Sequence, residues 1–400
     1  MPPFHQPRVL AAVAVLLVLG SGAAAQAPPT ARPRTVPARL PRAALDSILE
    51  SVRRESGVPG LSAAVIDLDG NMVSSAVGVR VMGLGSRVTP RDRFHVASLA
   101  KPMTATLAAM LVEEGKLRWS STAAEVFPEW ADSMPPSLRG VTLEMLLSHT
   151  AGIRSFESGA EYDSLPRFGG SPVERRAAFA RYLLTRPPAS APGTRYQYSN
   201  AGYALVGAML ERVAGEPIEK LLVDRLWRPL GITTGGFGWP ARADPWQPWG
   251  HYTTEIGQLP HPPDGKYALD PALAVSSGDV NMSMEDLARF LHLHLQGLRG
   301  RPRLLTARTF ARMHTPVAPA GAYGLGWGLA TLAREAGPGE SAGADGRVRF
   351  RVSEHDGSTG VFYTTVMVSP TRDVAIAVAT NSDLRDPANR VLRAIHARFR

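Results

Sequence analysis

The 400-residue chain contains no cysteine. This absence excludes disulfide bonds, cysteine-ligated metal ions and lipid attachment at a cysteine. The chain also lacks the internal repeats that indicate a solenoid. Its longest apolar run, Val9–Leu19, is shorter than the roughly 20 residues that a membrane-spanning helix needs. The sequence therefore predicts neither a disulfide scaffold nor a multi-span membrane protein, and it is long enough to bury a large core.

The first 25 residues have the three parts of an export signal. Arg8 supplies a positive charge, Val9–Leu19 forms an apolar core, and Ala23-Ala24-Ala25 are small residues of the kind found at a cleavage site. We expect cleavage near Ala25 and export to the periplasm or the exterior. An uncleaved anchor is the alternative, and the shortness of the apolar run argues against it.

Residues 26–42 are rich in Pro, Ala and Arg and predict a short tether. A single large domain is expected over residues 43–400. The formal net charge is +9, with arginine as the main contributor. No zinc-finger, RRM-like or basic-heptad pattern accompanies this charge, so nucleic-acid binding is not expected. From the positive charge we expect only peripheral association with the anionic cell envelope.

The pattern of apolar residues predicts an α+β fold with one antiparallel sheet built from both ends of the chain. A helix is expected over Pro41–Arg54, and a hairpin turn at Asp69-Gly70-Asn71 joins two strands. Residues 99–315 read as helices and loops, and a final helix is expected from about Pro387. The other expected strands are Leu61–Asp67, Met72–Val81, Trp327–Leu332, Val348–Ser353, Val361–Val368 and Val374–Ala379.

Ser98 and Lys101 form the most informative short pattern of the chain. Three residues apart at the start of a helix, they lie on one face, where a neutral amine can accept the hydroxyl proton of a serine. Pro102 places the start of the helix close to Ser98. The residues that follow are almost all apolar, which predicts a helix buried on every side and a lysine of lowered pKa. The structural alternatives are a helix-capping Ser98 and a surface Lys101.

Two further segments carry candidate site residues. Tyr198-Ser199-Asn200 precedes an apolar helix, and Tyr198 is a second candidate base, because nearby cations would stabilise its phenolate. Near the C-terminus, an alternating strand leads to His355-Asp356-Gly357-Ser358. The alternatives are a core tyrosine, a turn asparagine and a structural histidine at the end of a strand.

The order of these three segments resembles that of the serine β-lactamase superfamily. The middle Tyr-x-Asn is similar to that of class C-like β-lactamase-related proteins, family VIII carboxylesterases and D-amino-acid peptidases. The similarity spans about residues 45–400. Supporting segments are Leu146–Ile153 (including His149, expected to shape a loop), Tyr203–Gly215, Ser276–Phe290 and Tyr323–Gly328.

The resemblance implies a β-lactamase/DD-peptidase-like fold. A sheet of the five-stranded type would be flanked by terminal helices, with an inserted all-helical subdomain over roughly 120–315. The active site would lie where the sheet and the subdomain meet. Three tryptophans between 239 and 249 are expected in a long loop that either walls the acyl pocket or serves only packing.

The resemblance also implies residue roles. Ser98 would be the nucleophile and Lys101 the base, with Tyr198 as an alternative base. Asn200 would contact both Lys101 and the acyl part of the substrate, and the amides of Ser98 and Ser358 would form an oxyanion hole.

The third motif departs from the Lys-Thr/Ser-Gly of β-lactamases. A largely neutral His355 followed by Asp356 would bind neutral acyl substrates better than anionic β-lactams. Gly357 would let the substrate lie along the strand edge.

We therefore expect an exported serine hydrolase that acts through an acyl-enzyme on small esters or on D-configured amides or peptides. A D-alanyl-D-alanine carboxypeptidase or weak class C-type β-lactamase is the second reading. The third is a non-catalytic binding or scaffold protein on the same fold. No metal or organic cofactor is expected, since His292 and His294 alternate along a helix without a third ligand nearby.

Overall fold

The computed structural model describes residues 40–157, 161, 163–265, 270–336 and 341–399. The predicted export signal (1–25) and residues 26–39 of the predicted tether lie outside the described residues. In the described part of the chain, no helix is both long enough and apolar enough to span a bilayer.

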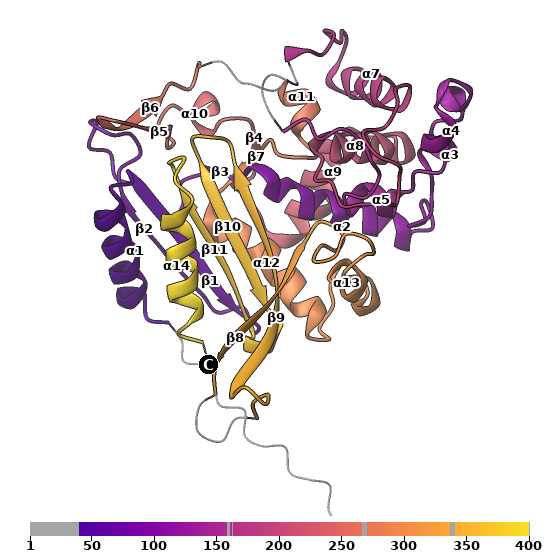
Figure 1. Cartoon of the computed structure of the whole chain (residues 1–400). Coiled ribbons are helices and arrows are strands. Elements are labelled where there is room, and N and C mark those ends of the chain that lie inside the picture. Colours follow the sequence, from indigo (N-terminus) through magenta and orange to yellow (C-terminus); the bar gives the residue numbers. More distant parts are fainter. Residues whose placement is uncertain (1–39, 158–160, 162, 266–269, 337–340, 400) are drawn as a thin grey trace, which may run out of the picture. The chain divides into compact units, whose positions relative to one another are not determined.

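The centre of the fold is an antiparallel sheet of six strands in the order β2-β1-β11-β10-β9-β8 (Figure 1). The predicted assembly of this sheet from both chain ends is confirmed: Leu61 in β1 pairs with Thr380 in β11. Each of the six strands corresponds to one expected from the sequence, whereas the five-stranded type implied by the resemblance is corrected to six, because β8 pairs with the edge of β9. The strands are β1 (Gly60–Asp67), β2 (Met72–Gly78), β8 (Gly328–Glu335), β9 (Arg347–Ser358), β10 (Tyr363–Ser369) and β11 (Val374–Thr380).

Helices cover both faces of the sheet, so its central strands are apolar on both sides. The terminal helices α1 (Arg42–Ser56) and α14 (Asp386–His396) pack on one face, and α12 (Met284–Leu298) packs on the other (Figure 1). Along β11 the residues alternate between the two layers. Val374, Ile376 and Val378 join the core beneath α1 and α14, whereas Ala375, Ala377 and Ala379 belong to the core on the α12 side.

The inserted region is mainly helical, but the expectation of an all-helical subdomain is wrong. Short strands β3 (Phe94–His95), β7 (Val280–Met282) and β4 (Gly236–Phe237) form a small second sheet, and β5 (Gly250–Thr254) pairs with β6 (Gly257–His261). Strands of two to five residues are too short to show the period of two in a sequence. The helices here include α3 (Ala123–Val126), α4 (Pro136–Arg139), α5 (Leu143–Leu147), α7 (Pro172–Leu184), α8 (Asn200–Ala214), α9 (Ile218–Leu221), α10 (Pro240–Ala243) and α11 (Pro271–Ala274).

A buried arginine joins the helices of this region. The guanidinium of Arg176 in α7 donates to Glu211 in α8 (2.6 Å), to Glu219 in α9 (2.8 Å) and to the carbonyl of Ala272 in α11 (2.7 Å). Arg176 is 1% exposed, so its charge is stabilised by these partners rather than by water. This contact fixes the position of α8, the helix that begins at the Tyr-Ser-Asn segment.

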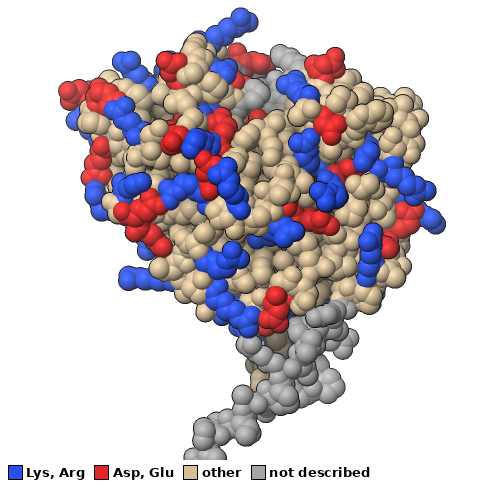
Figure 2. Space-filling model, turned by 180° about the vertical axis from the view of Figure 1, so that it is seen from behind, with Lys and Arg blue, Asp and Glu red and all other residues tan. Residues whose placement is uncertain are grey.

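Charged side chains are spread over the surface. Figure 2 shows Lys and Arg interspersed with Asp and Glu on the face opposite to that of Figure 1. On this face the positive charge does not gather in one patch.

A series of buried hydrogen bonds links Thr106 to Ser353 in β9 through two histidines. Thr106 Oγ1 donates to the carbonyl of Pro102 (2.8 Å) and accepts from His294 Nε2 (3.2 Å). His294 Nδ1 therefore accepts from His314 Nε2 (2.9 Å), and His314 Nδ1 accepts from Ser353 Oγ (2.6 Å). Both histidines are neutral, because burial lowers the pKa of His314 to about 3 and that of His294 well below its usual value.

These two histidines predict loss of stability in mild acid. The unfolded chain takes up protons near the ordinary histidine pKa of about 6.5, whereas the folded chain does not until near pH 3. The free energy of unfolding should therefore fall by about 1.4 kcal/mol per pH unit for each histidine as the pH drops below 6.5. Urea titrations at pH 7.5, 6.5, 5.5 and 5.0 measure this slope, and the variant His314→Gln should show a smaller one. A constant free energy from pH 7.5 to 5.0 would contradict the prediction.

Candidate functional site

Ser98 lies in a tight turn at the start of a buried helix. The 3-10 turn Ala97–Leu99 leads directly into α2 (Ala100–Glu113), in which every residue from Ala100 to Leu111 is buried, as predicted. Ala97 has a φ of 47°, a left-handed conformation that costs energy in a residue with a side chain. Its amide donates to His95 Nδ1 (3.1 Å), which helps to hold the turn that presents Ser98.

Lys101 lies on the first turn of α2, and its side chain is completely buried. Its Nζ atom is 3.1 Å from Ser98 Oγ, 2.7 Å from Asn200 Oδ1 and 2.6 Å from the carbonyl oxygen of Ser277. The last two oxygens can only accept, so they hold two N–H bonds of the amine. Burial lowers the pKa of Lys101 well below its usual value, against an opposing influence of Glu157. In the neutral amine the remaining position is a lone pair, and it faces Ser98 Oγ.

The segment before α8 brings a phenol to the same serine. Ser199 Oγ accepts from the amide of Gly202 (2.9 Å) and so caps α8. The hydroxyl of the preceding Tyr198 donates to Ser98 Oγ at 2.9 Å. The expectation of a stabilised phenolate is wrong, because burial raises the pKa of Tyr198 far above its usual value. Tyr198 is therefore a hydrogen-bond donor to Ser98 in the resting site.

Asn200 holds two parts of the site together. Its Oδ1 accepts from Lys101, as expected. Its Nδ2 donates to the carbonyl of Phe156 (2.9 Å), and its backbone amide donates to the carbonyl of Ser155 (2.8 Å). One hydrogen of the side-chain amide is thus used within the protein. The other has no partner among the described residues, and Asn200 lines the cavity.

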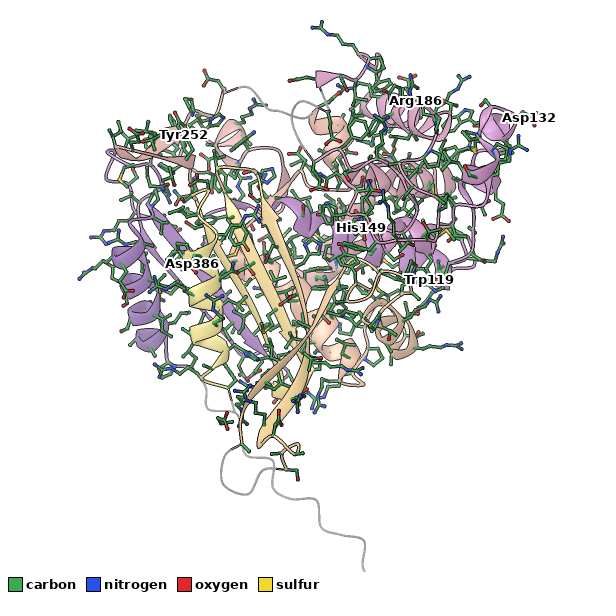
Figure 3. The ribbon with its side chains drawn as sticks, in the orientation of Figure 1. Trp119, Asp132, His149, Arg186, Tyr252 and Asp386 are labelled. Carbon is green, nitrogen blue, oxygen red and sulfur yellow. The ribbon has the colours of Figure 1, made fainter. Side chains whose placement is uncertain are left out.

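His149 is a supporting residue that the sequence placed only in a loop. It is 2% exposed, and its ring lies 4.4 Å from that of Tyr198 (centroid to centroid) at the junction of the helices and the sheet (Figure 3). Its Nδ1 accepts from the amide of Ser199 (3.0 Å). Burial lowers the pKa of His149 well below its usual value, so it packs as a neutral ring that fixes the orientation of Tyr198.

The end of β9 forms the opposite wall. His355 is 7% exposed and lines the cavity, but both of its ring nitrogens have partners within the protein. Nδ1 donates to the carbonyl of Asp356 (2.9 Å), and Nε2 accepts from the hydroxyl of Tyr323 (3.0 Å), a residue not predicted individually. Burial, followed by the nearby Lys101, lowers the pKa of His355 to about 3. It is therefore neutral, and its two hydrogen bonds are those expected of a structural histidine at the end of a strand.

Gly357 was expected to let a substrate lie along the strand edge, but it is the chain before Ser98 that comes close to it. A Cβ atom at this position would lie 2.1 Å from the carbonyl oxygen of Val96 and 2.9 Å from the side chain of Leu99. The space beside Gly357 is thus taken by the turn that carries Ser98, rather than by a substrate. The next residue, Ser358, is exposed and lines the cavity.

These groups open onto a cavity of about 1020 Å³. Ser98, Tyr198 and Asn200 line one part of it, and residues of β9, β10 and α14 line the rest. Trp239, one of the three loop tryptophans, also lines it, whereas Trp246 is 74% exposed.

His292 and His294 have different hydrogen-bond partners. His292 contacts the carbonyl of Leu68, and His294 belongs to the series of buried hydrogen bonds between Thr106 and Ser353. Within the described residues, no three His, Cys, Asp or Glu side chains are grouped so that they could hold a metal ion.

Comparison with known proteins agrees with this geometry. The sequence profile of the Beta-lactamase family matches residues 45–398. Penicillin-binding protein 4 of Amycolatopsis lactamdurans is 30% identical over 345 residues, which cover 83% of each chain. Unguisins hydrolase ungD' of Aspergillus campestris is 24% identical over 81% of this chain and 59% of its own length. Esterase EstB of Burkholderia gladioli is 29% identical over 49% of this chain and 51% of its own.

Solved structures share the fold. The octameric penicillin-binding protein homologue from Pyrococcus abyssi superposes with a TM-score of 0.68 at 24% identity, covering 88% of this chain and 76% of that one. SurE, solved with D-Leu, gives a TM-score of 0.63 at 27% identity, covering 90% of this chain and 74% of its own. The predicted fold class and superfamily are confirmed: the chain belongs to the Beta-lactamase family and is a serine hydrolase.

Proposed function

We propose that this enzyme hydrolyses esters, or D-configured amides or peptides, through an acyl-enzyme formed on Ser98. The observation that carries the proposal is the environment of Ser98 Oγ. It lies 3.1 Å from the Nζ of a buried lysine and accepts a hydrogen bond from the hydroxyl of Tyr198. Because two other oxygens hold the N–H bonds of Lys101, its lone pair is left for the serine proton.

The reaction then needs two displacements. Ser98 Oγ attacks the carbonyl carbon of the substrate while its proton passes to Lys101 Nζ. The tetrahedral intermediate collapses, the bond to the leaving group breaks, and the proton on Lys101 reaches the leaving group through the hydroxyl of Tyr198. A water molecule next attacks the acyl carbon and gives a proton to Lys101, and Ser98 leaves with that proton. The products are an acid and an alcohol or amine.

Other residues take supporting roles. The backbone amides of Ser98 and Ser358 are proposed to bind the oxyanion, which is worth several kcal/mol in such sites. Asn200 positions Lys101 and lies against the acyl part of the substrate. Gly357 is assigned to the packing of the Ser98 turn, because its missing side chain makes room for Val96.

The charges of the cavity favour neutral or cationic substrates over β-lactams. His355 is neutral where β-lactamases carry a lysine, so it offers no cation to a carboxylate. Glu157 and Asp356 both line the cavity, and their negative charges would repel an anion near Ser98. The two arginines of the cavity, Arg385 and Arg393, lie by Tyr363 and Asp386 instead. The likeness to SurE, which was solved with D-Leu, supports a D-configured substrate.

A second candidate is a D-alanyl-D-alanine carboxypeptidase or a weak β-lactamase. The 30% identity to penicillin-binding protein 4 favours it, and the cavity charges argue against it. Comparison of kcat/KM for nitrocefin and for short p-nitrophenyl esters separates the two candidates. Higher values for nitrocefin would favour the second candidate over the first.

We also propose export after cleavage near Ala25 and peripheral association with the anionic envelope. The three-part N-terminal segment and the net charge of +9 support these proposals. N-terminal sequencing of the protein recovered from its source would test the cleavage site.

Ser98→Ala should abolish covalent labelling by a fluorophosphonate. The alanine variant has no oxygen to form the bond, and the small change should leave the fold intact. Labelling is read by intact-protein mass spectrometry, with the exposed Ser47→Ala as the matched control. Labelling that survives in Ser98→Ala would remove Ser98 from the mechanism.

The rate on a neutral ester should depend on the charge of Lys101. Because burial lowers its pKa, the amine loses its proton as the pH rises through that lowered value, so kcat/KM should rise and then stay level at alkaline pH. Lys101→Arg keeps a cation that does not deprotonate, and it should lose at least about a hundredfold in kcat/KM. Lys116→Arg, at an exposed position, is the control. A Lys101→Arg variant that keeps the rising limb would contradict this role.

Gly357→Ala should reduce kcat far more than an ordinary glycine substitution. Its Cβ would meet the carbonyl of Val96 at 2.1 Å, so the turn that carries Ser98 must shift, and displacements of about 1 Å can cost a hundredfold in rate. Gly140→Ala, where a Cβ meets nothing within 4 Å, is the matched control. Equal kcat values in the two variants would show that this contact does not position Ser98.

A further inference from the structure

A carboxylate with no assigned role lines the cavity beside the nucleophile. Glu157 is exposed and lines the same cavity as Ser98, Tyr198 and Asn200. Among the described residues its carboxylate forms no ion pair, unlike many surface carboxylates of this protein. The residue comes from the loop after α5, in a segment that the motif analysis did not single out.

The position of Glu157 is set by the site itself. The two residues before it accept hydrogen bonds from Asn200: the carbonyl of Ser155 from its backbone amide at 2.8 Å, and the carbonyl of Phe156 from its side chain at 2.9 Å. Phe156 has a φ of 50°, which turns the chain sharply just before Glu157. Asn200, which binds Lys101, therefore also fixes the backbone directly before Glu157.

The negative charge of Glu157 influences the pKa values of two groups beside Ser98. It opposes the effect of burial on the pKa of Lys101 and adds to the raised pKa of Tyr198. Two arginines also line the cavity, Arg385 just before α14 and Arg393 within it. Arg385 lies over the ring of Tyr363, and Arg393 approaches Asp386 at 3.5 Å. At the nucleophile end, the cavity therefore presents a negative charge and a neutral histidine.

We propose that Glu157 binds an ammonium group on the acyl part of the substrate and so makes this enzyme select amino-bearing acyl groups. Suitable substrates are amino acid esters and amides, and peptides cleaved after a free N-terminal residue. A carboxylate without an ion-pair partner among the described residues is free to form a charge-assisted hydrogen bond to an ammonium group. This inference rests on the proposed function, since Asn200, assigned to the acyl side, carries the segment.

The test compares two esters that differ in one group. Alanine methyl ester (each enantiomer) carries an ammonium at pH 6.5, and methyl isobutyrate has a methyl group in its place. The wild-type enzyme should show the higher kcat/KM on one enantiomer of the alanine ester. In Glu157→Gln the ratio of the two kcat/KM values should fall at least about tenfold, mainly through a higher KM for the alanine ester. The matched control is Glu255→Gln, which removes an exposed carboxylate in the turn between β5 and β6 that does not line the cavity, and it should leave the ratio within about twofold.

Several outcomes would overturn the proposal. They are an equal loss on both esters in Glu157→Gln, a wild-type enzyme that does not prefer the ammonium ester, and a fall in the ratio in Glu255→Gln as large as that in Glu157→Gln. Hydrolysis of p-nitrophenyl acetate in each sample keeps this separate from the proposed function. If that ester is cleaved in a Ser98-dependent manner and the ammonium preference is absent, only the role of Glu157 fails.

Discussion

A primary amine without access to water lies at the centre of this enzyme. Burying a charged lysine costs several kcal/mol, so the protein either pairs the charge or favours the neutral form. Around Lys101 the nearest polar atoms are the uncharged oxygens of Asn200, Ser277 and Ser98. These partners satisfy the neutral amine without supplying a negative charge. Their arrangement leaves one lone pair, directed at the serine, and the chemistry proposed for this site depends on it.

Keeping the amine in place requires segments that are far apart in the chain. The carbonyl of Ser277 reaches Lys101 because the segment around Ser276 packs tightly on α8, where a Cβ at Gly207 would come within 2.6 Å of Ser276 Oγ. Arg176 binds Glu211, one turn further along the same face of α8. The close fit at these buried contacts leaves little freedom for the groups around Ser98 to move independently.

The sign of the charges around the serine sets this site apart from one built for anions. β-Lactamases carry a lysine in the third motif, whereas in this chain a neutral His355 is hydrogen-bonded to the hydroxyl of Tyr323 and to the carbonyl of Asp356. His355 therefore shapes the wall of the cavity without adding charge. In the proposed function, carboxylates that line the cavity favour substrates without a negative charge, because inside a partly desolvated cavity a single unbalanced charge has a large effect.

The sequence alone predicted those parts of the protein whose signals are local. The terminal helices, the hairpin between β1 and β2 and the apolar α2 follow from the spacing of apolar residues and from turn chemistry. The pairing of Ser98 with Lys101 follows from the helical repeat, and the order of the three motifs indicated the family. Tertiary structure alone decided the order in which the six strands pair and the short strands of the inserted region, since strand pairing is non-local. It also decided the supporting positions of His149, Tyr323 and Glu157. The expected phenolate of Tyr198 was wrong for the same reason: a pKa depends on burial, and burial is a property of the packed chain that no short stretch of sequence contains.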